Sequence, residues 1–475
     1  MVFSSLTFLC LFLPIVFILY TVIPNLKVRN VLLIIASLFF YAYGEPIYVF
    51  LMIFSSLLNY LCALWVCKNP KKKSKFALVF AVVVNLGILG VYKYTGFILD
   101  TVNSIFNLSI PVPQIALPIG ISFFTFQALS YVIDVYLGKV DVQKNFFNIL
   151  LYVSFFPQLI AGPIVKYHDI NEQIDNRKQD LDKIALGLRR FIVGLSKKVF
   201  IANTMGQVAD SIFATNADSL SILTAWLGAI AYIFQIYYDF CGYSDMAIGL
   251  GHMFGFEFKE NFNYPYGSKN IQDFWRRWHI SLSTWFKEYL YIPLGGNRKG
   301  KLRTAINKII VFFATGLWHG ANWTFVIWGL WHGMFLLLEE FIPFLKKLPK
   351  AIAHIYTMLV VALGFVVFRA DTIGYGLQYI MSMFTVNSNS ESLSLAISQL
   401  TPWFILILVA AVIGCAPIKP LTQKIQAHSH ADGATLSKKW KIIQIALYVL
   451  SFVMLLWCII RLSGTAYNPF IYFRF

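Results

Sequence analysis

The sequence predicts an all-α, polytopic integral membrane protein with about ten to twelve transmembrane helices, since a helix of about 20 apolar residues matches the core of a bilayer. Hydrophobic residues make up 58% of the 475 residues, and charged residues only 13%. That charged share is about half of what a soluble protein carries. The mean hydropathy is +0.67. No soluble core covers this much apolar surface, so the composition excludes a soluble protein.

The spans are expected in windows that contain no Asp, Glu, Lys or Arg. The clearest windows cover residues 3–26, 46–67, 145–165, 219–238, 309–338, 393–418 and 442–460. Shorter candidates cover residues 31–44, 76–91, 120–133, 351–368 and 372–383. Several windows are too short or too long for one straight span, and the longest leave room for a re-entrant turn. No linker or repeat divides the chain, so residues 1–475 are predicted to form one transmembrane domain.

The basic residues lie in short segments that flank these windows, and the formal net charge is +17. Membrane orientation and contact with anionic lipid explain this placement, so nucleic acid binding is not expected. A cluster of lysines is predicted to stay in the cytoplasm: Lys68, Lys71, Lys72, Lys73 and Lys75. Three membrane helices are expected before this cluster, so the N-terminus is predicted to lie on the outer side. The first window lacks the basic segment and the small-residue cleavage site of a signal peptide, so we expect it to be a membrane helix that is not removed.

Residues 257–308 are polar and yet rich in aromatic side chains. From Asn270 they are predicted to form one helix, with Asn270 as the N-cap and Asp273 at the third position, ending at Gly295 and Gly296. An aromatic and apolar stripe recurs along this helix at three- and four-residue steps, formed by Trp275, Trp278, Leu282, Trp285 and Tyr289. The basic residues that largely flank the stripe are Arg276, Arg277 and Lys287. Such a helix is expected at the membrane interface.

Two of the eight histidines stand out by their surroundings, His319 and His279. His319 lies in an apolar window, where a histidine is costly unless it lines a cavity or meets a partner. The pKa of imidazole, about 6.5, lets it take a proton from a hydroxyl near neutral pH and return it to a thiolate. His319 is therefore the candidate general base, the alternative being a hydrogen bond between helices. Asn322 and Trp323 are expected to share its helical face.

His332 lies thirteen residues after His319 in a similar Leu-Trp-His-Gly run. On one continuous helix the two rings would lie on opposite faces, about 20 Å apart, so they could not share a metal. No metal site is expected, and His332 is assigned a structural role. His279 is expected to orient an acyl donor or to act as a second acid and base, or else to anchor its helix at the interface. Asp239 and Asp245 are expected either to line a cavity or, as we favour, to fix a helix break.

Six runs of the sequence are distinctive: FFPQLIAGPIVKY, QIYYDFCGYSDMAIGLGHMFGF, NFNYPYGSKNIQDFWRRWHISLSTWFKEYLYIPLGGNR, GLWHGANWTFVIWGLWHG, FVVFRAD and NPFIYFRF. Over nearly its whole length the chain resembles the membrane-bound O-acyltransferase (MBOAT) superfamily, in the branch of bacterial alginate and peptidoglycan O-acetyltransferases. The resemblance matches His319 to the invariant histidine of the family, which lies on a buried helix. It matches His279, 40 residues earlier, to the second polar position.

The resemblance implies a ring of tilted helices around a central tunnel, in the bacterial inner membrane. It also implies acetyl transfer from cytoplasmic acetyl-CoA to hydroxyls of an extracytoplasmic polysaccharide, directly or through a partner of the SGNH esterase type. No bound cofactor is expected. The residues then expected to line the passage or contact substrate are Trp275, Trp278, Trp318 and Asn322. Arg276 and Arg277 are expected either to attract the phosphates of CoA or to anchor their helix to lipid.

Two other functions stay open. The related D-alanyl transfer protein of teichoic acid modification takes its acyl group from a carrier-protein thioester, and it shares the FWRRWH and GLWHG runs. Chain length and the extent of the similarity favour acetyl transfer. A polysaccharide or lipid transporter without covalent chemistry also needs many helices and a polar cavity. Against it, the chain shows no inverted repeat with paired broken segments.

Overall fold

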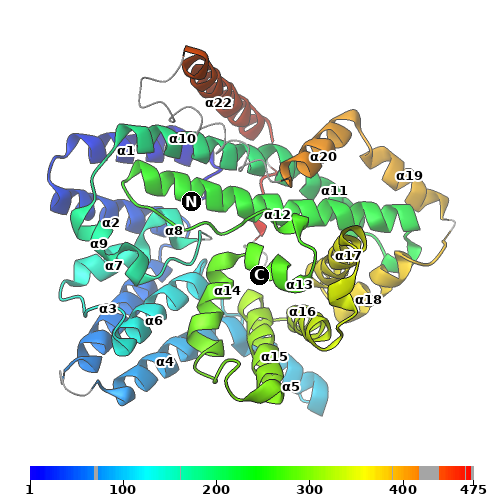
Figure 1. Cartoon of the computed structure of the whole chain (residues 1–475), viewed down its shortest axis with the longest axis horizontal. Coiled ribbons are helices and arrows are strands. Elements are labelled where there is room, and N and C mark those ends of the chain that lie inside the picture. Colours follow the sequence, from blue (N-terminus) through cyan, green and yellow to red (C-terminus); the bar gives the residue numbers. More distant parts are fainter. Residues whose placement is uncertain (69–72, 161, 388, 417–437, 466, 472–475) are drawn as a thin grey trace.

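Helices form the regular structure of this protein, seen in a computed structural model that describes residues 1–68, 73–160, 162–387, 389–416, 438–465 and 467–471. No strand occurs within these ranges. The predicted all-helical class is therefore confirmed. The elements form four consecutive groups, in which η marks a short 3-10 or π turn (Figure 1).

Most of the first group lies on the left of Figure 1, whereas α5 lies at its lower right. It comprises η1 (Phe8–Phe12), α1 (Leu13–Val22), α2 (Leu26–Ala42), α3 (Tyr48–Val66), α4 (Lys75–Leu89), η2 (Gly90–Tyr94), α5 (Thr95–Phe106), α6 (Ile121–Leu137), α7 (Phe146–Ser154), α8 (Phe156–Leu159) and α9 (Tyr167–Asn176). The window 145–165 is thus not one span, because the chain breaks between α7 and α8 at Phe155.

The second group crosses the upper part of Figure 1 as two long antiparallel layers. It comprises α10 (Leu181–Ser196), η3 (Lys197–Ala202), α11 (Asn203–Phe213), η4 (Ala217–Ser219) and α12 (Ile222–Met253). The predicted helix break at Asp239 and Asp245 is wrong, since α12 continues through both. Each carboxylate instead meets a cation of η3: Asp239 lies 2.8 Å from the Lys198 ammonium, and Asp245 lies 2.6 Å from that of Lys197. Paired carboxylates need no break in the helix.

The third group occupies the centre and lower part of Figure 1 and carries the candidate site. It comprises η5 (Pro265–Gly267), α13 (Ile271–Arg277), α14 (Ile280–Phe286), η6 (Lys287–Tyr291), α15 (Gly300–His319), α16 (Trp323–Phe341) and η7 (Leu345–Lys347). The fourth group comprises α17 (Lys350–Arg369), α18 (Ile373–Ser382), α19 (Ser390–Gln399), α20 (Pro402–Gly414) and α22 (Lys438–Gly464).

Charged side chains fasten the third group to the first. Glu288 of η6 accepts hydrogen bonds from the ammonium groups of Lys166, at 2.7 Å, and Lys139, at 3.0 Å. Burial acts to raise the pKa of the Glu288 carboxyl, but the two lysines outweigh it and hold this pKa below its ordinary value. Next to this cluster, Tyr289 donates to Asp134 of α6 over 2.8 Å. The segment that leads into α15 is thereby fixed against the C-terminal end of α6.

Four helical segments of the described chain are long and apolar enough to cross a membrane: Tyr48–Val66, Lys75–Phe106, Lys350–Arg369 and Ile442–Gly464. A fifth arises if α19 and α20, bent by 72°, form one broken span. The window 219–238 folds as part of the long, unbroken helix α12, which is not among these candidates. The remaining windows fold as shorter or broken helices. The predicted ten to twelve spans and the ring with its central tunnel therefore stay predictions.

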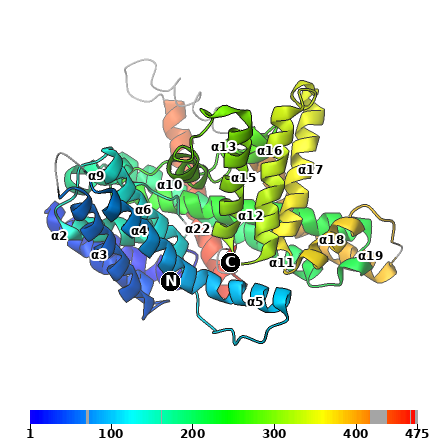
Figure 2. The same ribbon diagram turned by 90° about the horizontal axis from the view of Figure 1, so that it is seen from below.

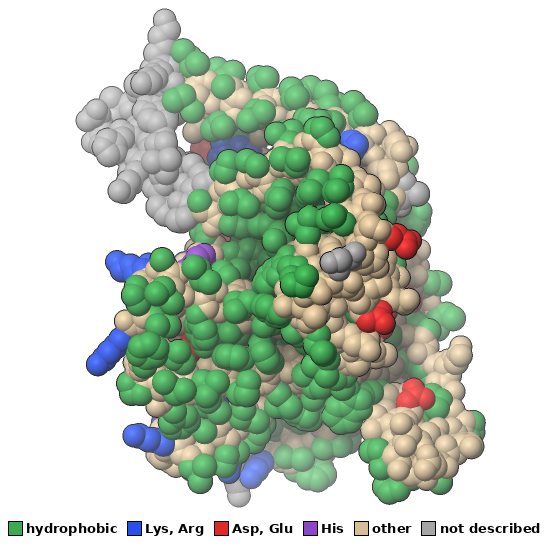
Figure 3. Space-filling view, turned by 90° about the vertical axis from the view of Figure 1, so that its right-hand side faces the viewer, with side chains coloured by type: hydrophobic (Ala, Val, Ile, Leu, Met, Phe, Trp, Pro, Cys, Tyr) green, Lys and Arg blue, Asp and Glu red, His purple; other side chains and the backbone are tan. Residues whose placement is uncertain are grey.

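The outer surface agrees with a membrane location. Many large apolar side chains are exposed, including Phe452 and Ile460 of α22, which are 59% and 65% exposed. Figure 3 shows one face as a broad hydrophobic band, with Lys and Arg side chains gathered at its left edge and acidic side chains toward its right. A soluble monomer rarely exposes apolar patches above a few hundred Å², so we assign this band to lipid.

Candidate active site

The window 309–338 folds as two helices, α15 and α16, separated by Gly320, Ala321 and Asn322. Gly320 is required here, because a Cβ at this position would lie 2.1 Å from the ring of Phe325. Asn322 then caps α16, its side-chain oxygen accepting from the N–H of Thr324 over 3.0 Å. The premise that one continuous helix carries His319 and His332 is therefore wrong. His319 is the last residue of α15, and His332 lies on α16.

The predicted single helix from Asn270 is also broken. Its N-cap is confirmed, since the Asn270 side chain accepts from the N–H of Asp273. The helix ends, however, at Arg277, and His279 adopts a left-handed backbone with φ 43° and ψ 55°. The chain before α13 explains the break, because the carbonyl of Asn261 accepts from Ile280 N–H over 2.9 Å. Tertiary hydrogen bonds thus replace the helical ones.

The break turns the ring of His279 inward, toward α12 and the end of α15. The side chain is 1% exposed, and its ring stands edge-on to Phe240 with the centroids 4.6 Å apart. The alternative in which His279 anchors its helix at the membrane interface does not agree with this burial. The ring centroids of His279 and His319 lie 6.5 Å apart, with Trp318 against both at 5.8 and 5.1 Å.

Hydrogen bonds fix the tautomer of His279. The backbone N–H of Ser281 can only donate, and it lies 3.1 Å from the side-chain oxygen of Asn261. That oxygen therefore also faces Nδ1 of His279, at 3.2 Å, so Nδ1 carries the proton. Nε2 is left with its lone pair, and it has no hydrogen-bond partner among the described residues. A buried histidine in this state can accept a proton.

A cavity of about 260 Å³ borders His319 and Trp318. Its other walls come from Lys93 of η2, from Ser122 at the start of α6 and from residues 117–121. A neighbouring cavity of about 320 Å³ is lined by Lys93 and Leu117 as well as by Asn322. Of the predicted site residues, His319 and Trp318 thus border the first cavity and Asn322 the second, and His319 is only 6% exposed.

Behind His319 the core contains polar ring atoms without hydrogen bonds. Trp328 stands edge-on to His319, at 5.0 Å, and packs against Trp275 at 5.6 Å and His332 at 5.2 Å. The indole N–H groups of Trp275 and Trp328 and both ring nitrogens of His332 have no partner among the described residues. Buried polar atoms are normally satisfied, so each such exception calls for an explanation. A polar ligand passing along this core would supply the missing partners.

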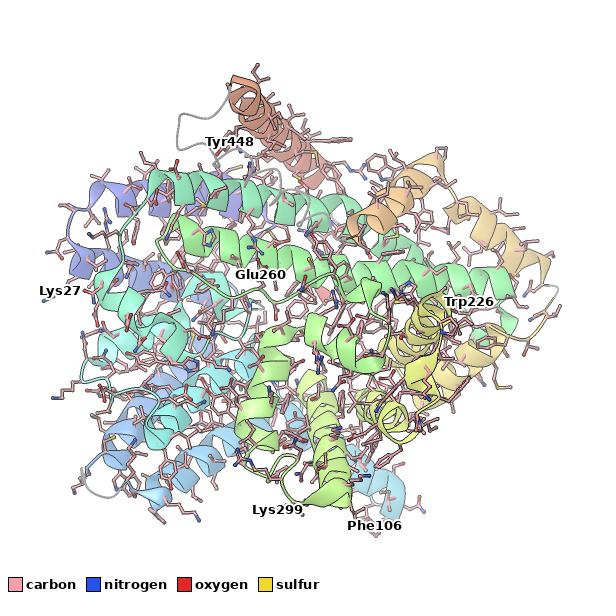
Figure 4. The ribbon with its side chains drawn as sticks, viewed as in Figure 1. Lys27, Phe106, Trp226, Glu260, Lys299 and Tyr448 are labelled. Atoms are coloured by element: carbon pink, nitrogen blue, oxygen red, sulfur yellow. The ribbon has the colours of Figure 1, made fainter. Side chains whose placement is uncertain are left out.

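The remaining predicted residues are spread around the site. Trp278 packs against Phe262 and Phe365, at 5.2 Å each, away from His319. Arg277 forms an ion pair with Asp273 at 2.9 Å, and Arg276 is exposed. Figure 4 shows the side chains of this region below α12, with Lys299 labelled beside the start of α15. His319 occupies the opposite end of that helix.

Comparison with known proteins identifies the family. The model of the membrane-bound O-acyltransferase family matches residues 139–369. The probable alginate O-acetylase AlgI of Pseudomonas putida is 42% identical to this chain, in an alignment that covers 100% of both. The chain belongs to the membrane-bound O-acyltransferase family. The probable alginate O-acetylase AlgI of Azotobacter vinelandii is 40% identical to this chain, again over 100% of both chains. The peptidoglycan O-acetyltransferase of Helicobacter pylori is 39% identical over 82% of this chain and 81% of the relative.

This membrane-bound O-acyltransferase therefore falls in the branch that the resemblance indicated, and the prediction of an O-acyltransferase is confirmed. The similarity to the teichoic acid D-alanyltransferase of Bacillus subtilis is weaker, at 29% identity over 53% of this chain and 68% of the relative.

Sequence reasoning missed three side chains that the site uses. Asn261 and Trp328 gave no signal, because one lies in a loop and the other in an apolar run. Lys93 did give one, since a single cation within the long apolar stretch 76–106 is costly unless it is paired or functional.

Proposed function

We propose that this membrane-bound O-acyltransferase moves an acetyl group from acetyl-CoA to hydroxyls of an extracytoplasmic polysaccharide, across the bacterial inner membrane. Relatives named alginate O-acetylase and peptidoglycan O-acetyltransferase support acetyl as the group and a polysaccharide as the acceptor. The observation that carries the proposal is the position of His319, which borders a cavity and has a second buried histidine 6.5 Å away.

In the proposed reaction His319 takes the proton of the acceptor hydroxyl. The hydroxyl oxygen then bonds to the thioester carbonyl carbon, the carbon–sulfur bond breaks, and the imidazolium returns the proton to the leaving thiolate. Atoms and charges balance without a further reactant. His279 supports the step, because its Nε2 is held as a proton acceptor by the Asn261 contact at Nδ1.

A basic cavity on the far side of the core is our proposed mouth for the donor. It measures about 490 Å³ and is lined by the four lysines Lys269, Lys308, Lys346 and Lys350 and by two glutamates, Glu339 and Glu340, the second of which is ion-paired with Lys308. Clustered ammonium groups attract the phosphates of a donor such as acetyl-CoA. From there the unpaired atoms of Trp275, His332 and Trp328 lead toward His319. The amides of the donor arm would find hydrogen-bond partners along this line.

The acceptor side of the reaction allows two routes. The acetyl group reaches the polysaccharide directly, or a partner of the SGNH esterase type carries it there. D-alanyl transfer is the second candidate function, because a teichoic acid D-alanyltransferase shares 29% identity over 53% of the chain. The acetyl assignment is preferred, since the O-acetylases match over 100% of the chain.

The decisive experiment follows labelled acetyl from acetyl-CoA to candidate glycans in the presence of the purified protein. An SGNH-type protein encoded by a neighbouring gene is supplied in one arm and omitted in the other. His319→Ala is expected to abolish transfer. His252→Ala is the matched control, because it also removes an imidazole, in the last turn of α12, but one that borders neither the cavities at His319 nor the proposed donor mouth, and it is expected to retain transfer.

Both variants are compared at equal membrane abundance and with equal gel-filtration profiles. Transfer retained by purified His319→Ala would rule out His319 as the base. If the wild type transfers no acetyl but accepts an aminoacyl thioester from a carrier protein, the D-alanyl function replaces the acetyl one.

A further inference from the structure

The carbonyl end of α15 needs partners from outside the helix. The last four carbonyl groups of an α-helix have no N–H partner within it. In α15 these belong to Gly316, Leu317, Trp318 and His319. The first is satisfied locally, because Gly320 N–H reaches the Gly316 oxygen over 3.4 Å. The other three carbonyls belong to the turn that carries the candidate base.

Two consecutive side chains of η2 satisfy all three. The hydroxyl of Tyr94 donates to the carbonyl of Leu317 over 2.6 Å. The ammonium of Lys93 donates to the carbonyls of Trp318, at 2.6 Å, and His319, at 3.1 Å. This segment lies more than 220 residues away in the chain, so the contact is a tertiary clamp on the end of α15.

Lys93 is saturated by these contacts. An ammonium has three hydrogens, and the third points to the Ser122 hydroxyl at 3.3 Å. Lys93 therefore has no hydrogen left for an anionic ligand, although it lines both cavities beside His319. Its positive charge also suits the negative end of the helix dipole. These features indicate that Lys93 acts on the helix end and not on the substrate.

The place of Lys93 in its own helix is unusual as well. It lies in a π turn within the apolar stretch Lys75–Phe106. A π turn inside an α-helix frequently marks a functional site, and a cation in a membrane span is costly unless it is paired. The clamp explains both features, because the wider turn presents Lys93 and Tyr94 together to α15.

We propose that Lys93 is a positioning residue for acyl transfer, holding the carbonyl end of α15 so that the imidazole of His319 stays aimed at the cavity. The proposal rests on the proposed function of His319. Misplacing a catalytic group by about 1 Å can cost about 100-fold in rate. Loss of the clamp should therefore lower kcat while leaving the binding of the acetyl donor unchanged.

The test compares Lys93→Met with Lys73→Met in the acetyl-transfer assay. Lys73 is the matched control, because its ammonium also donates to a carbonyl near a helix end, that of Val135 in α6, and it borders neither cavity at His319. Lys93→Met is expected to lower kcat about 10- to 100-fold, with the KM for acetyl-CoA changed less than about twofold. Lys73→Met is expected to keep kcat within about twofold of the wild type.

Conservative variants separate positioning from folding. Lys93→Gln keeps N–H donors without the charge, so it should recover part of the activity lost in Lys93→Met. Tyr94→Phe frees one carbonyl only and should lower kcat less. A wild-type kcat in Lys93→Met overturns the proposal. An equal loss of kcat in Lys73→Met also overturns it. The proposal fails as well if Lys93→Gln is no more active than Lys93→Met and the loss of kcat in both is accompanied by a lower unfolding temperature.

The same assay distinguishes failure of this proposal from failure of the proposed function. If Lys93→Met is active while His319→Ala is inactive, only the clamp is refuted. If His319→Ala is active, the proposed function itself fails.

Discussion

The backbone of His279 is the most telling feature at the scale of single residues. Few residues other than glycine adopt a positive φ, and functional sites are where such strain tends to persist. Here the left-handed conformation brings the imidazole to the Asn261 oxygen and to within 6.5 Å of His319, measured between ring centroids. The strained backbone thus brings together two histidines that are 40 residues apart in the sequence.

Asn261 is predicted to control the tautomer of His279. Asn261→Leu removes the acceptor for Nδ1–H, so the proton is free to move to Nε2 and block its lone pair. The acetyl-transfer kcat is expected to fall about 10- to 100-fold, within the usual contribution of a general base. Asn261→Asp keeps an oxygen opposite Nδ1 and should retain much more activity. Equal activity in the two variants would show that the tautomer does not matter.

The sequence indicated which two histidines lie close together, but not the backbone geometry that brings them there. Residue type and context pointed to His319 and His279, and the structure brings them together. Trp278 and Arg277 were grouped with them by their place in one run, yet the break after Arg277 sends them to other neighbours. The residues around position 279 do not predict the helix break, because the hydrogen bonds that stabilise it come from Asn261 and Asn263.

At the scale of elements, helix packing depends on close backbone contact between α10 and α12. A Cβ on Gly194 would lie 2.5 Å from the carbonyl oxygen of Gly242, and one on Gly187 would lie 2.5 Å from that of Gly249. The two contacts recur after seven residues on each helix, in antiparallel order. Small residues allow such close approach between membrane helices. Apolar windows indicated where many of the helices lie, but which helices pair depends on contacts that are distant in sequence.

Gly194→Ala is predicted to destabilise the protein. The added methyl group would force the two helices apart, and overpacking of this kind costs about 1–3 kcal/mol. Gly87→Ala in α4 is the control, since a Cβ there meets no atom within 4 Å. The measurement is the apparent unfolding temperature of each purified variant in one detergent. A Gly194→Ala midpoint no lower than that of Gly87→Ala would contradict the predicted contact.

At the scale of the whole molecule, α6 separates two chemically different ends. Its first turn carries Ser122, which meets Lys93 beside His319. Its last turn meets Lys73 and leads to Lys139 and Glu288. With about 1.5 Å per residue, the two ends lie roughly 20 Å apart. In Figure 2, α13 and the link between α16 and α17 lie at one end of the molecule and α5 lies at the other.

Composition predicted a helical membrane protein because hydrophobicity needs no knowledge of contacts. The number of membrane spans cannot be predicted from composition in the same way. Helices such as α7 and α8 are short and buried, so protein contacts, and not the thickness of the bilayer, determine where they end. Lys71 and Lys72 of the cluster that set the predicted orientation lie outside the described residues. Lys73 and Lys75 lie within them, at the end of α6 opposite His319 and at the start of α4.

The positive-inside rule predicts that the lysine-bearing end faces the cytoplasm. Lys347 of η7 is exposed at that end, whereas Leu108, just after α5, is 48% exposed at the other. A membrane-impermeant maleimide added to intact spheroplasts should therefore label Leu108→Cys, and label Lys347→Cys only after permeabilisation. The parent chain gives the baseline, because Cys10 is already exposed. The reverse pattern would invert the molecule, placing the basic cavity outside, where no cytoplasmic thioester could reach it.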